Sequence, residues 1–578
     1  MDRKGKRGSL TRPGRAKKRK FCGNRHTIEA ETSYVSTSAE KLRKTGDNEL
    51  RISREHGYSV LNFFSVFSAI SALVMCKQCK KDIMFKEASP RGLGFKIAVE
   101  CSCGVTYINS CPLIDNAFEI NRRIVLAMRL IGVGMKGLNL FCGIMDICQG
   151  LAINTYYACL QNIYCASETV YDIVTRRAIE EEREKNVEHG NLPSELTVSG
   201  DGTWKKRGFS SLFGVSTLVG VYSNKVIDTL VKSSFCQTCN LWKNKFGTVE
   251  YEDWKHSHQD ECTNNHEGSA DKMEVNAVKE MFLRSMDKYQ VKYKRYVGDG
   301  DSKTFKSISE TMIYGENFIV ETKEYVEHVK KRMGARLRNT KEKNKDIGGE
   351  GAGKLTDKII SELSTYYGLA IRRNPESVEE MKNAIWATFD HERSTDENPH
   401  HERCPEGFTS WCAWRKAEAA GTLNTFTHDK IPLNDEVLNV IRPIYEDLTT
   451  DDLLQRCLGS FTQHNNESLN SLIWTIVPKH LHCGKKTVEV ATFLAVCLFN
   501  EGFHTILKIM DVMGLQIGQN AKFLADNRDN ERVKCLEQRT SYESKEARIA
   551  KRQKKAGQHE FFEVEESLLY GPGITDEG

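Results

Sequence analysis

Residues 195–235 read ELTVSGDGTWKKRGFSSLFGVSTLVGVYSNKVIDTLVKSSF, and this stretch decides the fold. It contains three runs rich in Val, Thr, Leu and Phe, at Glu195–Trp204, Phe209–Tyr222 and Lys225–Phe235. Lys-Lys-Arg-Gly and Ser-Asn turn signals separate the runs, which is typical of successive β-strands. Three strands that follow one another so closely predict an antiparallel meander.

Helices and strands alternate after this meander. The sequence predicts a helix over Lys272–Tyr289, a strand over Tyr293–Gly298, a helix from Ser302 and a strand over Asn317–Thr322. A meander followed by helix, strand, helix and strand predicts a mixed α/β layer structure. This order matches that of a ribonuclease-H-like core.

Two aspartates lie at predicted strand ends. Asp201 comes where the first strand gives way to a glycine-containing turn, and Asp299 follows the Tyr293–Gly298 strand within Gly-Asp-Gly-Asp. Carboxylates held by a rigid sheet, beside glycines that permit close approach, suit a divalent cation or a phosphate. For either motif alone, the alternative is an ordinary Asp-Gly turn.

A third acid is expected because two metal ions need several bridging carboxylates. We assign it to Glu467, within TQHNNESLN at residues 462–470, because its polar neighbours would be unusual on an ordinary buried helix. Alternatively, Asn465 caps a helix whose first turn contains Glu467. Glu274 and Asp301 are reserve candidates for the acidic site.

Four short runs carry a resemblance to a known family. They are DGTWKKRGFSS (201–211), GDGDSK (298–303), HVKKRMGARLR (328–338) and TQHNNESLN (462–470). In this order and spacing, the chain resembles the Mutator-like transposase domain of eukaryotic DNA transposons, from about Cys76 to beyond Asn500. The family commonly has Cys-x-x-His after the second aspartate, where this chain has Tyr325 and His328.

The resemblance implies a ribonuclease-H-like fold with a DDE triad, which by position is Asp201, Asp299 and Glu467. It implies a DNA transposase that uses Mg²⁺ or Mn²⁺ to cleave phosphodiesters at transposon ends and to transfer the strands. The implied partners are double-stranded DNA, as terminal repeats and as target, and further copies of the chain in a homo-oligomer. The alternatives are a catalytically inactive, transposase-derived, zinc-dependent DNA-binding protein and a metal-dependent nuclease without strand transfer.

The chain has 19 cysteines and no secretory signal before its first apolar stretch, which favours metal sites over disulfides. Three Cys/His sets are candidate Zn²⁺ ligands; the first has regular knuckle spacing, the second has one shortened knuckle and the third is irregular. Reduced structural thiols are the alternative. The sets are Cys236, Cys239, His258 and Cys262; Cys76, Cys79, Cys101 and Cys103; and His391, His401, Cys404 and Cys412, with His266 and Cys111 as substitutes in the first and second.

Positive charge gathers in two places, although the formal net charge is only +5. Residues 1–20 contain ten basic side chains and one acid, which predicts a disordered arm for nuclear localisation or polyanion binding, or a merely solubilising tail. A second run would neutralise DNA phosphates, with a solvated helix face as the alternative. Its residues are His328, Lys330, Lys331, Arg332, Arg336 and Arg338.

Apolar spacing predicts the remaining helices. The uncharged stretch Gly57–Cys76 is interpreted as an amphipathic helix and not as a membrane span. Helices at Asn121–Ile131, Leu138–Met145 and Ile153–Tyr164 fit either a helix-turn-helix DNA reader or a helical packing subdomain. Further helices are expected at 178–188, 357–372, 377–388, 435–457, 465–474, 488–500 and 545–555.

We therefore expect an α/β protein with a ribonuclease-H-like mixed sheet core, a zinc-binding insert, a helical insertion and an N-terminal zinc/helical DNA-binding region. The expected segments are a basic tail and linker (1–56), an amphipathic helix with a zinc-ribbon-like module (57–115), a helix-turn-helix-like region (116–190), the core with its zinc insert at 236–266 (191–328), a helical insertion (329–460), the C-terminal part of the core (461–545) and a charged tail (546–578).

Overall fold

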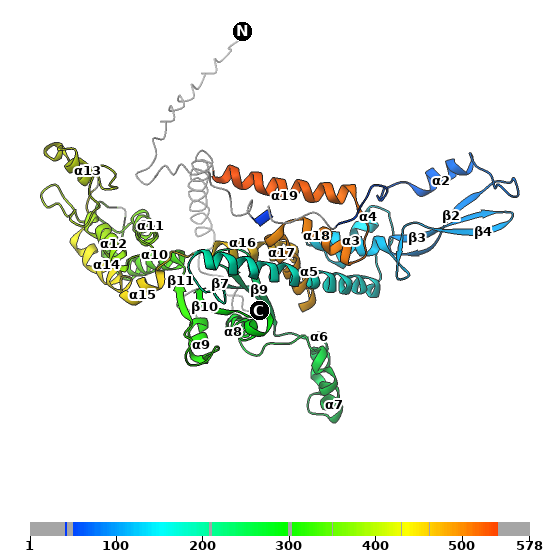
Figure 1. The fold of residues 1–578 in the computed structure, drawn as a ribbon, viewed down its shortest axis with the longest axis horizontal. Coiled ribbons are helices and arrows are strands. Elements are labelled where there is room, and N and C mark those ends of the chain that lie inside the picture. The colour runs from blue at the N-terminus through cyan, green and yellow to red at the C-terminus, as the bar shows by residue number, and fades with distance from the viewer. Residues whose placement is uncertain are drawn as a thin grey trace, which may run out of the picture. The chain divides into compact units, whose positions relative to one another are not determined.

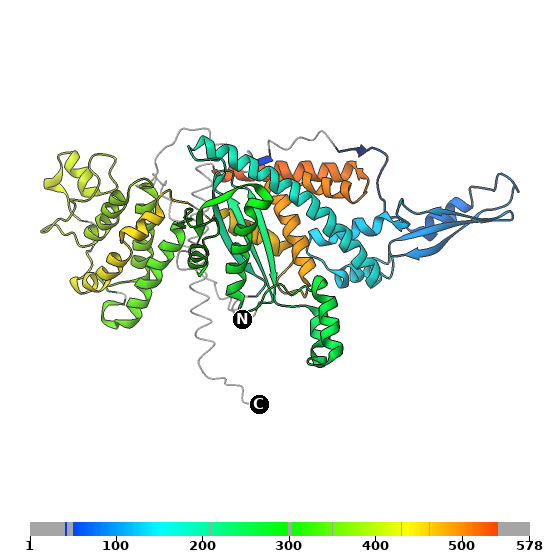
Figure 2. The same cartoon turned by 60° about the horizontal axis from the view of Figure 1, so that its bottom comes forward.

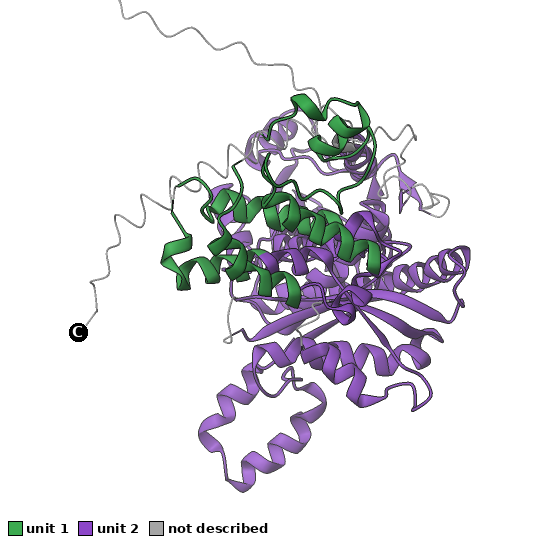
Figure 3. Ribbon diagram, turned by 90° about the vertical axis from the view of Figure 1, so that its left-hand side faces the viewer, with its two compact units in different colours: residues 1–33, 334–370, 379–447 green, residues 34–333, 371–378, 448–578 purple. Residues whose placement is uncertain are grey.

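The computed structural model describes residues 41–42, 50–206, 211–298, 303–349, 351–428, 431–461 and 463–540 (Figure 1). The basic tail, Asp299, Asp301 and the helix predicted at 545–555 lie outside these residues. The chain divides into two compact units, which are described separately (Figure 3). The larger unit contains residues 34–333, 371–378 and 448–578, and the smaller contains residues 1–33, 334–370 and 379–447.

A five-stranded mixed sheet belongs to the larger unit. Its strands are β7 (Glu195–Trp204), β8 (Phe213–Gly220), β9 (Val226–Ser233), β10 (Lys292–Gly298) and β11 (Glu321–Glu324). They lie in the order β11-β10-β7-β8-β9. β8 is antiparallel to both of its neighbours, whereas β7, β10 and β11 run parallel to one another. The predicted antiparallel meander of three successive strands is confirmed.

The last strand is shorter than its predicted run. β11 begins at Glu321, four residues after the predicted start at Asn317. The backbone N–H of Phe318 donates instead to the Gly315 carbonyl, so this part of the run is a turn. After this turn, β11 begins to pair with β10 at Glu321.

Helices cover both faces of the sheet (Figures 1 and 2). On one face lie α5 (Ile153–Glu188), α16 (His464–Ile476) and α17 (Lys485–Glu501). On the other lies α8 (Ala270–Tyr289), with α9 (Lys303–Thr311) beside it. Each face has its own cluster of buried apolar side chains. Burial from both sides explains why β8 is buried at every position and lacks polar alternation.

The prediction of two separate helices at 153–164 and 178–188 is wrong. Both segments belong to one helix of 36 residues, α5. Residues 165–177 contain no glycine or proline that would end a helix. Val170, Tyr171 and Val174 continue the buried stripe between the two predicted parts. Several Ser and Thr residues of low helix propensity hide this continuity in the sequence.

The N-terminal part of the larger unit contains a small antiparallel sheet and a short helix, α2 (Phe63–Ser71). The predicted helix over Gly57–Cys76 is wrong in length, because the Asn62 side chain accepts a hydrogen bond from the Ser65 N–H and caps the helix there. The strands of this part are β1 (Ile52–Ser53), β2 (Met84–Arg91), β3 (Gly94–Cys101), β4 (Gly104–Asn109), β5 (Leu113–Ile114) and β6 (Ala117–Phe118). Of these, β2, β3 and β4 form the three-stranded sheet. β1 pairs with β12 (Ile517–Gly518).

Two short helices follow, α3 (Glu119–Leu130) and α4 (Met135–Ile144), bent by 112° at the predicted glycine turn. The exposed side chains of α4 include Leu140, Phe141 and Ile144, which are apolar. Within the described part of the chain, no single helix has the length and apolar character of a membrane span, although α3 and α4 pass that test by length and composition as a bent pair.

An insert after β9 stands clear of the sheet (Figures 1 and 3). It contains α6 (Gln237–Trp242), the 3-10 turn η1 (Lys243–Lys245), α7 (Val249–His258) and the 3-10 turn η2 (Gln259–Glu261). The larger unit is completed by α15 (Asp451–Cys457), α18 (His504–Val512) and α19 (Gln519–Thr540).

The smaller unit is helical in its described residues. Its elements are the end of α10 (Val326–Lys343), η3 (Lys345–Ile347), α11 (Asp357–Arg373), α12 (Val378–Glu392), α13 (Ala413–Ala419), η4 (Leu423–Thr425) and α14 (Asp435–Asp447). The single helix predicted at 435–457 is wrong, because α14 ends at Asp447 and α15 begins at Asp451. Thr450 has extended backbone and precedes two acids, Asp451 and Asp452, in the first turn of a new helix.

Candidate functional site

One face of β7 is polar, and α16 lies along it. Leu196 and Val198 point into the apolar cluster beneath α8, so the alternate residues face the other side of the sheet. Three of these contact residues spaced four apart on α16, through hydrogen bonds of 3.0, 2.7 and 2.8 Å. The pairs are Ser199 with Asn466, Asp201 with Asn470 and Thr203 with Trp474. Every second residue of β7 thus meets every fourth residue of α16 along this contact.

The prediction that Asp201 lies at a strand end is wrong. Asp201 lies inside β7, because pairing with β8 continues as far as Trp204. On the other side, the pairing between β7 and β10 stops at Ser199 and Val297. Asp201 therefore lies just beyond the stretch in which β7 has strands on both sides. One of its carboxylate oxygens, Oδ2, accepts a hydrogen bond of 2.7 Å from the side-chain amide of Asn470.

Glu467 lies on α16, one position after Asn466, and its side chain is 52% exposed. Its Oε2 lies 3.6 Å from the Nδ1 of His464, one helical turn earlier. That ring nitrogen is also 3.1 Å from the hydroxyl of Tyr325. Burial raises the pKa of the Tyr325 phenol, and the negative charges of Glu467, Glu327 and Asp201 raise it further. The buried phenol of Tyr325 thus contacts the histidine that neighbours Glu467.

Gln463 fixes the start of α16 on the sheet. Its side-chain amide donates to the Gly200 carbonyl at 2.6 Å, and it is almost fully buried. Glu467 is four residues later and therefore lies on the same side of the helix as Gln463. The polar neighbours that made the 462–470 run unusual are thus used to hold α16 on β7.

The reserve candidate Glu274 lies on the other face of the sheet. A Cβ added to Gly202 would stand 2.4 Å from the Glu274 carboxylate, so the glycine makes room for it. Gly202 is adjacent to Asp201 and therefore points to the opposite side of β7. Of the two described alternatives, Glu467 belongs to the helix that contacts Asp201, whereas Glu274 belongs to α8.

The basic residues predicted to contact DNA lie on α10 and differ in their surroundings. Arg332 forms an ion pair of 2.8 Å with the fully buried Glu324, which indicates a structural role. Lys331 and Arg338 are exposed and seven residues apart, so they share a face of the helix. The others are half-buried or paired: His328 has its ring 4.8 Å from that of Tyr325, Lys330 pairs with Glu327 at 3.3 Å, and Arg336 pairs with Asp447 at 3.1 Å.

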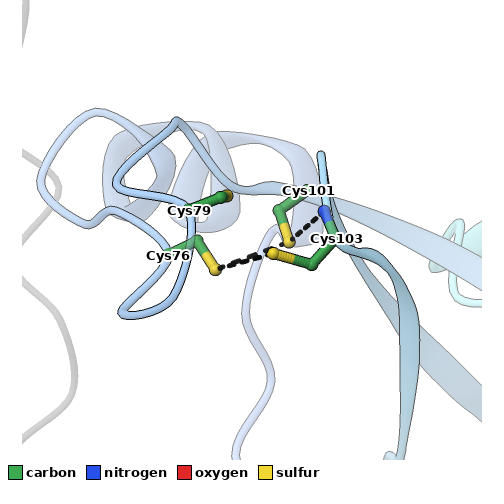
Figure 4. A group of neighbouring side chains, drawn as sticks. All are labelled: Cys76, Cys79, Cys101 and Cys103. Carbon is green, nitrogen blue, oxygen red and sulfur yellow. Dashed lines mark hydrogen bonds between the residues drawn. The ribbon is translucent and has the colours of Figure 1, made fainter.

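The set with the shortened knuckle, Cys76, Cys79, Cys101 and Cys103, comes together beside the three-stranded sheet (Figure 4). The Cys76 sulfur lies 3.6 Å from that of Cys101 and 3.9 Å from that of Cys103, with Cys79 completing the group. Backbone N–H groups of Cys79 and Gln78 lower the pKa of the Cys76 thiol to about 6. Such a thiolate is the form that binds a metal ion.

The set with regular knuckle spacing, Cys236, Cys239, His258 and Cys262, comes together in the insert. The Cys236 sulfur lies 3.3 Å from the Nε2 of His258, and the sulfurs of Cys239 and Cys262 lie 3.5 Å apart. Burial alone would raise the pKa of the Cys236 thiol, but hydrogen bonds from the Cys239 backbone and from Thr263 lower it to about 5. The substitute ligand His266 is outside this group and contacts the Ser269 carbonyl at 3.0 Å.

The third set, despite its irregular spacing, comes together between α12 and α13 in the smaller unit. The Nδ1 of His401 lies 3.3 Å from that of His391 and 3.4 Å from the Cys412 sulfur. The Cys404 sulfur lies 3.8 Å from the same Nδ1. In all three sets, the ligand atoms lie within 4.8 Å of one another, and the thiol and imidazole donors suit Zn²⁺.

The contacts made by Asn470, Gln463 and Tyr325 were not predicted from the sequence. Their only signal in the sequence is the polar 462–470 run and the tyrosine at the family's cysteine position. His428 was not predicted either: its Nε2 lies 3.0 Å from the Nε2 of His401, a member of the third set. Each of these contacts joins residues far apart in the chain or in loops without regular spacing.

The comparisons with known proteins agree with the resemblance drawn from the sequence. A family model described as Mutator-like transposase matches residues 57–412. No curated protein and no solved structure matches the chain. The matched region covers more than half of the 578 residues and contains Asp201 and all three Cys/His sets, whereas α16 lies beyond its end.

Proposed function

The chain belongs to the Mutator-like transposase family, and from this premise we propose that it is a DDE-type DNA transposase. It would catalyse metal-dependent phosphodiester cleavage and strand transfer at transposon ends. One observation carries the proposal: Asp201 of β7 is held by α16, the helix that also bears Glu467. Acidic side chains on neighbouring rigid elements are what a divalent cation site requires.

The sheet supports the proposal of a ribonuclease-H-like core. In chain order its strands lie 3-2-1-4-5, with the second strand antiparallel to the rest. Helices on both faces of such a sheet agree with that fold. The zinc insert then falls between the third strand and the following helix α8, and the helical insertion falls between β11 and α16.

Asp299 is proposed as the second acid. The parallel register of β10 and β7 pairs Val297 with Ser199. Asp299 and Asp201 each come two residues later in the sequence. This equal offset supports their assignment to one acidic site, with Glu467 as the third member.

Asp201, Asp299 and Glu467 would hold Mg²⁺ or Mn²⁺, since hard divalent cations prefer carboxylate oxygens. Bound there, such ions would supply charge stabilisation for the attacking water and for the leaving oxygen in phosphodiester cleavage. The protein's part is to hold the carboxylates in fixed positions and to align the DNA strand. The three Cys/His sets would bind structural Zn²⁺, and the DNA would be cut in the nucleus by a homo-oligomer that pairs two ends.

We propose that Lys331 and Arg338, the exposed basic residues that share a face of α10, contact DNA. Charge reversal tests this. Replacing Lys331 and Arg338 with glutamate is expected to weaken binding to terminal-repeat DNA by about tenfold or more and to reduce the salt dependence of binding by about two ion equivalents. The measurement is fluorescence anisotropy over a series of salt concentrations. Lys358→Glu, an exposed change on α11, is the matched control. If the double variant showed the same salt dependence of DNA binding as the wild type, Lys331 and Arg338 would not contact the DNA.

A second candidate function is that of an inactive, transposase-derived DNA-binding protein. It is favoured by Tyr325, which stands where the family commonly has cysteine and contacts His464. The two functions differ in one assay: cleavage of a labelled duplex carrying the element's terminal repeat, with Mg²⁺, Mn²⁺ or EDTA. We expect nicking with either metal and none with EDTA. Binding without any cleavage would support the inactive protein instead.

A further inference from the structure

Asn470 occupies an unusual position beside the proposed acidic site. Its side chain is 91% buried on α16, and its Nδ2 donates to the Asp201 Oδ2 at 2.7 Å. An amide is a neutral donor, so it fixes one carboxylate oxygen without cancelling the negative charge. A lysine or arginine in this place would instead form an ion pair that competes with a cation.

The other end of the same amide is unsatisfied. The Oδ1 of Asn470 is buried and has no hydrogen-bond partner among the described residues. A buried carbonyl oxygen without a partner costs free energy, so native structures rarely leave one. Because the Nδ2 of this group already contacts Asp201, a partner for the Oδ1 would lie in the immediate surroundings of the proposed acidic site.

We propose that Asn470 is a positioning residue for the divalent cation: its N–H holds Asp201, and its Oδ1 accepts a hydrogen bond from the hydrated Mg²⁺ or Mn²⁺. This inference rests on the proposed function, because it assumes that Asp201 binds the cation. It adds a fourth residue, which is not an acid, to the metal-binding machinery. The neighbouring pairs Ser199 with Asn466 and Thr203 with Trp474 hold the helix but do not involve a carboxylate.

The test is Mn²⁺ binding to the zinc-loaded full-length protein, measured by isothermal titration without DNA. Asn470→Ala is expected to weaken Mn²⁺ binding by about 10- to 100-fold, as loss of a residue that orients a ligand usually does. Asn465→Ala is the matched control, because the side-chain amide of this α16 asparagine donates to the Asn224 side-chain oxygen at 2.8 Å and not to a carboxylate. Asp201→Asn serves as the reference for loss of the site.

A second variant guards against a folding defect. Asn470→Asp has nearly the same shape but places a carboxylate against Asp201, so the two repel unless a cation lies between them. Its melting temperature is therefore expected to rise with Mn²⁺ more steeply than that of the wild type.

Three outcomes decide the inference. Weaker binding in Asn470→Ala together with normal binding in Asn465→Ala supports it. If Asn470→Ala binds Mn²⁺ like the wild type while Asp201→Asn does not, the role of Asn470 is overturned and the proposed function stands. If the wild type shows no Mn²⁺ binding that depends on Asp201, both are overturned.

Discussion

Asp201→Asn is expected to reduce metal-dependent nicking of terminal-repeat DNA by at least about 1,000-fold, because loss of a metal-binding carboxylate removes several kcal/mol of transition-state stabilisation. The change removes charge but little volume, and Asn470 still has an oxygen to which its amide can donate. The fold should therefore persist. The measurement is the single-turnover rate of cleavage in Mg²⁺ and in Mn²⁺.

The control for this substitution is Asp287→Asn, an exposed aspartate at the end of α8, which should cleave at the wild-type rate. DNA affinity should be preserved in both variants, since removing a negative charge does not weaken contacts with phosphates. Glu467→Gln should reproduce the loss seen with Asp201→Asn. If Asp201→Asn cleaved normally, the acidic site would have to be assigned to other residues.

The sheet was predictable because its strands have strong local signals. The β-branched runs of β7, β8 and β9 and the turns between them define the meander in the sequence itself. The errors arose where a local signal was weak or ambiguous. A Ser- and Thr-containing stretch hid the continuity of α5, and a short break at 448–450 was concealed by the apolar spacing on both sides of it.

The candidate site was predictable in part. The polar alternation of β7 and the polar 462–470 run are visible in the sequence, but nothing local shows that they meet. Asp201 and Asn470 are separated by 269 positions, and their contact depends on how α16 packs along β7. The Cys/His sets differ in this respect, because the ligand chemistry restricts the candidates to few residues and the structure brings each set together.

Loss of zinc from the insert is expected to unfold it while the sheet stays folded. Neither α6 nor η1 nor η2 has a buried side chain, and His258 is the one buried residue of α7. A segment with so little apolar burial cannot offset its loss of conformational entropy, whereas structural Zn²⁺ contributes about 10–16 kcal/mol in small zinc modules. Cys239→Ser should therefore lower the zinc content from three ions to two.

Limited proteolysis locates this effect within the chain. Cleavage between residues 237 and 265 should become at least about tenfold faster in Cys239→Ser, because the open form of the insert is cut in proportion to its population. Cys535→Ser, which removes an exposed cysteine of α19 outside the three sets, should change neither zinc content nor cleavage. The insert stands clear of the sheet, so the main thermal transition should stay in place (Figure 1). An unchanged zinc content and an unchanged cleavage rate in Cys239→Ser would show instead that Cys239 is not a zinc ligand.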